Sequence, residues 1–330
     1  ARSRSGGGGG SRGGGSGRGQ GGQGGQGRNG AARGSGGGRS ARPAGTEVLE
    51  AARVDLPVVI DGNDDTAAFA ANRRRALVVA AVPALVALVV VALACVAAGA
   101  ALIGVAAGVV VALVLWLALW RNAPALVLRA LGTRPGSDPE LQRADNIVEG
   151  LCASMGLEAP DIVVLDEDAR LALAVGRPGV PGTLVVSTAL LHDLDPVALE
   201  GVLAHELVHV KRGDTAPATM ACAVLLPLAR VLPAADLVHA VAGRGREFRT
   251  DRLAIGVTRY PPGLRDALVL MAEGPVPGSA SPLAGGGVAR ATRWLWTVAL
   301  PDTPDGPVLR ASSVGELDAP AVRIAALDEW

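Results

Sequence analysis

Residues 195–214 read DPVALEGVLAHELVHVKRGD, a run in which both ends of a helix can be recognised. Asp195 followed by Pro196 predicts the start, because an aspartate caps exposed N–H groups and proline suits a first helical turn. Gly213, which follows two basic residues, predicts the end, because glycine readily adopts the left-handed conformation that closes many helices. The sequence therefore predicts one helix across this stretch.

Within this helix the sequence HELVH, residues 205–209, brings two imidazoles and one carboxylate together. His205 and His209 are four residues apart, so they share one face and can reach one ion. Zinc suits such ligands and leaves a position for water, and Glu206 is placed to take a proton from that water. The alternative is an accidental pair on a surface helix. The flanking apolar residues disfavour it, because buried histidines without partners are costly.

A third metal ligand must come from elsewhere in the chain. The pattern that places a third histidine shortly after the motif is absent, because Arg212 stands where its glycine would be. The spare histidines, His192 and His239, suit caps or interfaces better than ligation. The acidic candidates are Asp214, Glu247 and Asp251.

The surroundings of these acidic residues distinguish them in part. Glu247 opens a predicted helix, and Asp251 lies one turn further on the same face, where it suits holding a ligating histidine. Asp214 follows the end of the motif helix, so its direction is less certain, and it too is assigned to support of the ligands. Arg244 and Arg246 are candidates for binding substrate or stabilising charge.

Residues 76–120 contain no charged residue. Their length fits two membrane-spanning helices, Ala76–Ala98 and Ala100–Trp120, with a turn near Gly99. The alternative is a hairpin buried in a soluble core, but soluble helices rarely stay apolar on all sides for this length. Arginines flank the stretch on both sides and are absent from the turn, which predicts that both ends face the cytoplasm.

The remaining segments complete the expected organisation. Residues 1–46 are rich in glycine and arginine and predict a disordered tail, since they hold almost no bulky apolar residue. Residues 47–75 form a juxtamembrane segment, 121–273 a metallopeptidase domain, and 274–330 its C-terminal extension. Residues 216–242 are expected as a third membrane-associated helix, or as an interfacial or buried one. Short β-branched runs predict strands at 161–165, 171–175 and 183–187.

In these motifs the chain resembles the HtpX-like membrane zinc peptidases, relatives of the CAAX-prenyl endopeptidases. Residues 201–214 look like that family's active-site helix, and GRGREFRTD, residues 243–251, looks like its second motif. The resemblance implies that Glu247 is the third zinc ligand. Residues 318–327 are similar to the family's C-terminal segment. The family implies a cytoplasmic active site and turnover of damaged membrane proteins.

The sequence thus predicts an α+β fold: a zincin-like metallopeptidase domain, mainly helical with a small β-sheet, joined to a transmembrane helical hairpin. The expected function is that of a zinc endopeptidase of the gluzincin type, with one Zn²⁺ ion, in the cell membrane. Polypeptides, membrane proteins above all, are the expected substrates, and the lipid bilayer the expected partner. The alternatives are a silent membrane scaffold with a structural zinc site, or a nucleic-acid binder acting through the tail. The balanced net charge gives no support to nucleic acid as a partner.

Overall fold

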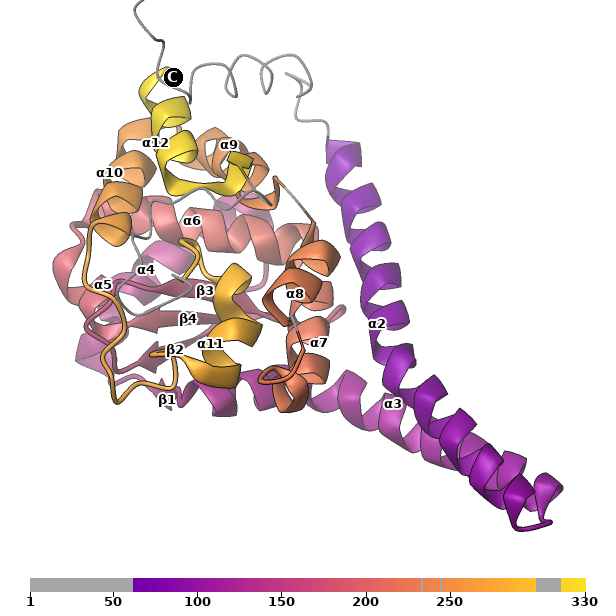
Figure 1. Ribbon diagram of the computed structural model, residues 1–330. Coiled ribbons are helices and arrows are strands. Elements are labelled where there is room, and N and C mark those ends of the chain that lie inside the picture. The colour runs from indigo at the N-terminus through magenta and orange to yellow at the C-terminus, as the bar shows by residue number, and fades with distance from the viewer. Residues whose placement is uncertain (1–61, 233, 244, 301–315) are drawn as a thin grey trace, which may run out of the picture. The chain divides into compact units, whose positions relative to one another are not determined.

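Two long helices, α2 (Gly62–Ala97) and α3 (Ala101–Leu131), pack against each other as an antiparallel hairpin (Figure 1). The computed structural model describes residues 62–300 and 316–330, apart from 233 and 244. The chain reverses at Gly99, whose φ of 76° lies in the left-handed region that favours glycine. The predicted turn is therefore confirmed. The tail 1–46 and the beginning of the juxtamembrane segment lie outside the described residues.

Close packing within the hairpin depends on small residues of α3. A Cβ atom at Gly104 would lie 2.3 Å from the Cβ of Cys95, and one at Gly108 would lie 2.8 Å from a methyl carbon of Leu88. The helix α2 begins before its predicted start, at Gly62 instead of Ala76, and α3 runs to Leu131 instead of stopping at Trp120.

Apolar side chains cover the outside of this hairpin. Within the described residues, two helices are long and apolar enough to cross a membrane, and their most apolar windows are only 17% and 11% buried. Leu102 is 88% exposed and Ile103 is 71% exposed. Such exposure does not fit the alternative of a hairpin buried in a soluble core.

A four-stranded sheet follows in the described part of the chain, in the order β1-β2-β4-β3. Its strands are β1 (Arg134–Pro135), β2 (Asp161–Leu165), β3 (Ala172–Val175) and β4 (Thr183–Ser187). β2 pairs parallel to β4, with Val163 opposite Val185, whereas β1 and β3 run antiparallel to their neighbours. The three predicted strands are confirmed, and β3 forms one edge of the sheet.

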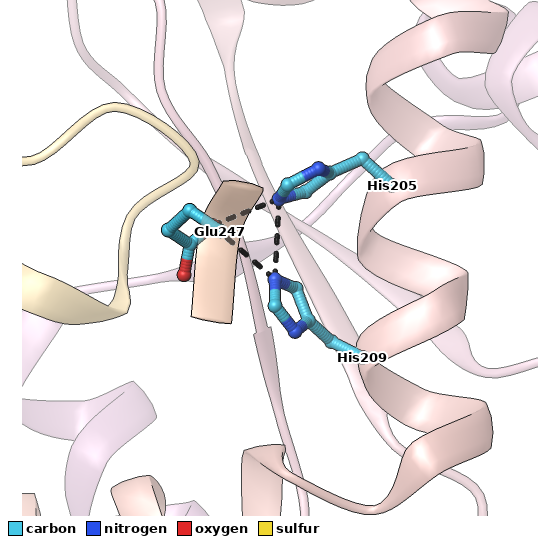
Figure 2. Close-up of side chains that lie close together, drawn as sticks. All are labelled: His205, His209 and Glu247. Atoms are coloured by element: carbon cyan, nitrogen blue, oxygen red, sulfur yellow. Dashed lines mark hydrogen bonds and ion pairs between the residues drawn. The ribbon is translucent and has the colours of Figure 1, made fainter. Parts of the chain in front are cut away.

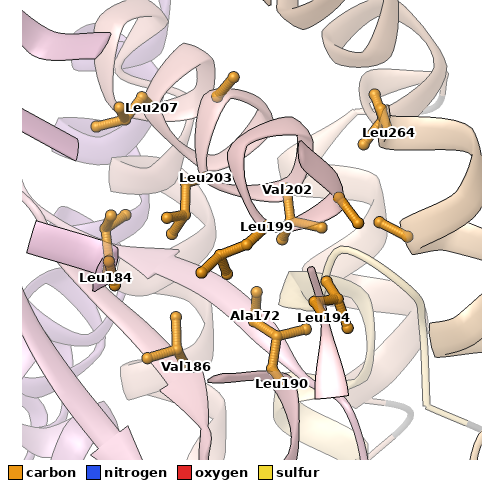
Figure 3. Close-up of a cluster of buried hydrophobic side chains, with 14 of the residues drawn as sticks. Ala172, Leu184, Val186, Leu190, Leu194, Leu199, Val202, Leu203, Leu207 and Leu264 are labelled. Carbon is orange, nitrogen blue, oxygen red and sulfur yellow. The ribbon is translucent and has the colours of Figure 1, made fainter. Parts of the chain in front are cut away.

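The motif helix α6 (Pro196–Arg212) lies across this sheet and begins and ends where the sequence predicts (Figure 1). The Asp195 side chain accepts hydrogen bonds from two backbone N–H groups of its first turn, and Gly213 closes it at φ 66°. Apolar side chains of α6 pack against those of β3, β4 and the segment 188–194 in one cluster (Figure 3). This cluster fixes α6 over the sheet and so fixes the histidines that it carries.

Further helices pack on α6 or on its neighbours. They are α4 (Asp138–Met155), α5 (Thr188–Asp193), α9 (Arg246–Thr258), α10 (Pro261–Ala272), α11 (Gly286–Thr292) and α12 (Pro320–Asp328). A Cβ atom at Gly201 would lie 2.7 Å from the backbone nitrogen of Leu264, so α10 crosses α6 in direct backbone contact. The helix α9 packs against α6, and α12 packs against α10. Single 3-10 turns occupy Leu226–Leu228, Arg293–Leu295 and Glu316–Asp318.

The apolar segment 216–242 is not one continuous helix. It divides into α7 (Thr215–Leu225) and α8 (Ala234–Ala242), separated by a turn. Nearly all of α7 is buried, where it packs against α2, α3 and β3. Of the alternatives expected for this segment, burial fits α7, and it explains the apolar sequence of that helix. Membrane contact of the exposed turn and of α8 stays a prediction.

Candidate metal centre

Three side chains from two helices converge on one point (Figure 2). His205 and His209 project from the same face of α6, and Glu247 comes from the first turn of α9. Glu247 Oε2 lies 2.9 Å from His205 Nε2 and 3.3 Å from His209 Nε2, and the two nitrogens are 3.1 Å apart. Since one atom of each residue lies within 4.8 Å of the others, a single ion could contact all three. The structure thus brings together the three residues that the sequence and the resemblance select.

The second oxygen of Glu247 faces Arg246. Arg246 donates to Glu247 Oε1 from Nε at 2.8 Å, and its Nη2 lies 2.6 Å from the same oxygen. Burial raises the pKa of the Glu247 carboxyl, but the Arg246 guanidinium and His209 lower it more, so its pKa lies well below the ordinary value. Arg246 therefore keeps Glu247 ionised and leaves Oε2 directed at the histidines. Arg244, the other arginine of interest, lies outside the described residues.

Each histidine has a carboxylate on its far ring nitrogen. Asp251 Oδ1 lies 2.8 Å from His205 Nδ1, and Asp214 Oδ1 lies 2.8 Å from His209 Nδ1. Burial lowers the pKa of His209, but the carboxylates of Asp214 and Glu247 together raise it to about 10. A carboxylate on Nδ1 places the remaining lone pair of a neutral imidazole on Nε2, where a metal would bind. Asp214 therefore lies as close to His209 as Asp251 lies to His205.

Glu206 follows His205 directly on α6 and is 1% exposed. Its Oε1 accepts a hydrogen bond from Thr297 Oγ1 at 2.5 Å, and its Oε2 has no hydrogen-bond partner among the described residues. Thr297 also donates its backbone N–H to the carbonyl of Ala172 on the edge strand β3, at 2.9 Å. The carboxylate that could accept a proton is thus held at one oxygen and free at the other.

Sequence reasoning did not assign Thr297, Asp318 or Arg323 to the site. Arg323 donates to both oxygens of Asp251, at 2.6 and 2.7 Å, from helix α12. Asp318 accepts backbone N–H groups at the start of α9. One signal was available for Arg323: it is a lone charge in the apolar run PAVRIAAL, residues 320–327.

The two spare histidines do not join the ligand group. His192 has a side chain that is 90% exposed, and it contacts Asp193. His239 is buried and stacks on Trp294, with ring centroids 4.3 Å apart. Its Nε2 lies 3.7 Å from Asp318 instead of near His205 or His209. Neither spare histidine therefore lies with His205 and His209, in agreement with the choice of a carboxylate as the third ligand candidate.

The donor set fits a zinc ion. Two imidazoles and one ionised carboxylate, with supporting carboxylates on both rings, match the ligand types and outer contacts of catalytic zinc sites. The site side chains are buried, so strong electrostatic interactions are retained within it. A mixed sheet crossed by an HExxH helix, with a carboxylate supplied by a second helix, defines a candidate metallopeptidase.

Comparisons with known proteins agree. Residues 138–274 match peptidase family M48. A protease HtpX homolog of Acidiphilium cryptum is 31% identical over 206 residues, which are 52% of this chain and 71% of that protein. A protease HtpX homolog of Dictyoglomus thermophilum is 30% identical over 182 residues, 45% of this chain and 60% of that protein. The chain therefore belongs to peptidase family M48, among its HtpX-like members.

The extent of these matches is limited. The chain spans 60% of the Dictyoglomus thermophilum relative, and 28% of a protease HtpX homolog of Bacteroides fragilis to which it is 37% identical over 89 residues. No solved structure matches the chain.

Proposed function

We propose that this protein is a membrane-bound, zinc-dependent endopeptidase. His205, His209 and Glu247 hold the ion, Glu206 is the general base, and Asp251 and Asp214 orient the two histidines. The observation that carries the proposal is the convergence of three ligand atoms within 4.8 Å beside a buried glutamate. The relatives named as proteases support a peptidase reaction in particular.

Each residue of the site has its own role in the hydrolysis of a peptide bond. A bound zinc ion would polarise the scissile carbonyl and lower the pKa of a water molecule. Glu206 takes the proton of the attacking water at its free Oε2 and later delivers it to the leaving amine. Thr297 fixes the other oxygen of Glu206 through a hydrogen bond of 2.5 Å, so the free oxygen keeps its direction. Arg246 holds Glu247 in its ionised form.

The hairpin supports a location in the cell membrane. Its exposed apolar surface and its length suit a bilayer, and arginine flanks the stretch on both sides. We propose a multi-pass arrangement with the catalytic domain in the cytoplasm and polypeptide substrates that include membrane proteins. Turnover of damaged membrane proteins follows from the family resemblance. The glycine- and arginine-rich tail is not assigned a nucleic-acid partner.

The test combines metal analysis and casein degradation by the full chain purified in detergent. Wild type should hold one zinc per chain and degrade the casein. Glu206→Gln keeps the size of the side chain but removes the base, so zinc should remain while hydrolysis largely disappears. Glu200→Gln is the matched control, because it makes the same change on the same helix, and it should behave like wild type.

Two results would contradict the proposal. Full hydrolysis by Glu206→Gln would exclude the assigned base. Zinc binding without hydrolysis by wild type, over a range of unfolded and membrane-embedded substrates, would favour a scaffold with a structural zinc ion. Deletion of residues 1–46 should leave hydrolysis unchanged, whereas a nucleic-acid binder acting through the tail would lose its activity.

A further inference from the structure

Asp318 stabilises the start of α9 from a distant part of the chain. The residue before that helix is Gly245, which has no side chain to cap the exposed N–H groups. Asp318 supplies the missing acceptor: Oδ2 takes the N–H of Gly245 at 2.8 Å, and Oδ1 takes those of Glu247 at 3.0 Å and Phe248 at 3.2 Å. Because one of these N–H groups belongs to Glu247, the contact fixes the backbone of the proposed third ligand.

Arg323 connects a ligand and the base from the same C-terminal segment. Its guanidinium is 1% exposed and binds both oxygens of Asp251, at 2.6 and 2.7 Å. Asp251 in turn lies 2.8 Å from His205 Nδ1. The Nη1 group of Arg323 donates to the backbone carbonyl of Thr297, whose hydroxyl contacts Glu206. One buried cation therefore lies behind both a histidine and the catalytic glutamate.

The contacts of Asp318 and Arg323 are not needed merely to attach helix α12 to the rest of the domain. The helix α12 has another ion pair with α10, in which Arg265 Nε lies 2.7 Å from Asp328, both side chains being largely exposed. Its apolar residues also pack on Phe248 and on the main core. A buried ion pair adds little net stability compared with apolar residues of similar size. Orientation of Asp251 therefore explains the buried guanidinium of Arg323 better than stabilisation of the packing of α12 does.

We infer that Asp318 and Arg323 are positioning residues of the metal centre. Asp318 sets the position of Glu247 through the α9 backbone, and Arg323 sets Asp251 and thereby the ring of His205. Both residues lie beyond residues 138–274, the stretch that matches peptidase family M48, and within the segment 318–327 that resembles the family's C-terminal segment. The inference rests on the proposed function, because it takes His205, His209 and Glu247 as ligands.

The experiment uses the full chain in detergent and four variants. Zinc affinity is measured by competition with a chromophoric chelator, and the visible absorption spectrum of the Co²⁺-loaded protein reports ligand geometry. Asp318→Ala and Arg323→Lys should each weaken zinc binding by roughly 10–100-fold, the usual cost of losing an outer contact, and shift the Co²⁺ spectrum. Asp318→Asn keeps one carbonyl acceptor and should fall between Asp318→Ala and wild type. Asp328→Asn removes the exposed ion pair and should match wild type.

The outcomes separate this inference from the proposed function. Wild-type zinc affinity and an unchanged Co²⁺ spectrum in Asp318→Ala and Arg323→Lys would overturn the inference alone. Equal loss of thermal stability with and without metal, and no spectral shift, would also overturn it, because that pattern marks a purely structural role. If Arg323→Lys does not fold, the graded series of Asp318 variants decides. A wild-type chain that binds no zinc would overturn both.

Discussion

The helical hairpin and the metal centre place polar and apolar groups in opposite ways. In α2 and α3 the apolar side chains face outward, as at Leu102 and Ile103, and the close contacts between helices involve small residues. Between α6 and α9 the ionised groups are inside, and the carboxylates of Glu247 and Asp251 are each paired with an arginine. Exposed apolar surface is stable in lipid, whereas buried charge is stable only when it is paired. The two regions therefore depend on different surroundings.

The largest effect is expected from a substitution that removes one charge from the metal centre. Glu247→Ala leaves two imidazoles, which bind zinc weakly, and leaves Arg246 buried without its partner. Stoichiometric zinc and hydrolysis should both be lost, measured by metal analysis and casein degradation. Glu149→Ala, an exposed glutamate on α4, is the control and should change neither. Retention of one zinc per chain by Glu247→Ala would show that another residue is the third ligand.

A second prediction tests whether the exposed apolar region crosses a bilayer. Single cysteines are placed at Ala98, in the hairpin turn, and at Asn146, on an exposed position of α4. In intact cells a membrane-impermeant thiol reagent should label Ala98→Cys and should reach Asn146→Cys only after lysis. Wild type gives the background from its three native cysteines. Labelling of Asn146→Cys in intact cells would place the catalytic domain on the outer side.

The third prediction compares the two carboxylates behind the histidines. Asp214 and Asp251 each place a carboxylate oxygen 2.8 Å from the Nδ1 atom of one histidine, His209 and His205 respectively. Each substitution by alanine should therefore weaken zinc binding by roughly 10–100-fold, measured by chelator competition. Asp251→Ala should also lower stability more, since it leaves Arg323 buried without its partner. Near-normal zinc affinity in Asp214→Ala would mean that only one of the two histidines needs such support.

Local signals explain which parts could be predicted from the sequence. The ends of α6 and the central strands follow from caps, glycine and β-branched runs, all readable within a few residues. HExxH selects two ligand candidates and a candidate base by spacing alone. Thr297 and Arg323 were missed because their partners, Glu206 and Asp251, lie 91 and 72 positions away in the sequence.

Tertiary contacts also explain where the predicted element bounds differ. Residues 62–75 were expected only as part of a juxtamembrane segment, yet they are helical, and this part of α2 packs on the end of α6. Asp65 pairs with Arg212 at 2.9 Å, and Asn72 donates to the Arg212 carbonyl at 3.1 Å. This contact joins the hairpin to the helix that carries the histidines, one residue before Gly213.

The last prediction concerns the contact between α2 of the hairpin and the end of α6, the helix that carries the histidines. Gly213 and Gly156 both end helices at φ 66°, so alanine at either position should cost about 1–2 kcal/mol of backbone strain. A Cβ at Gly156 meets nothing within 4 Å, but one at Gly213 would lie 2.6 Å from the ring of Phe69 on α2. Gly213→Ala should therefore cost about 1 kcal/mol more than Gly156→Ala, measured by denaturant unfolding in detergent. Phe69→Ala should remove that difference in the double variant, because the clash is gone. Equal costs for the two glycines with Phe69 in place would mean that α2 does not press on the end of α6.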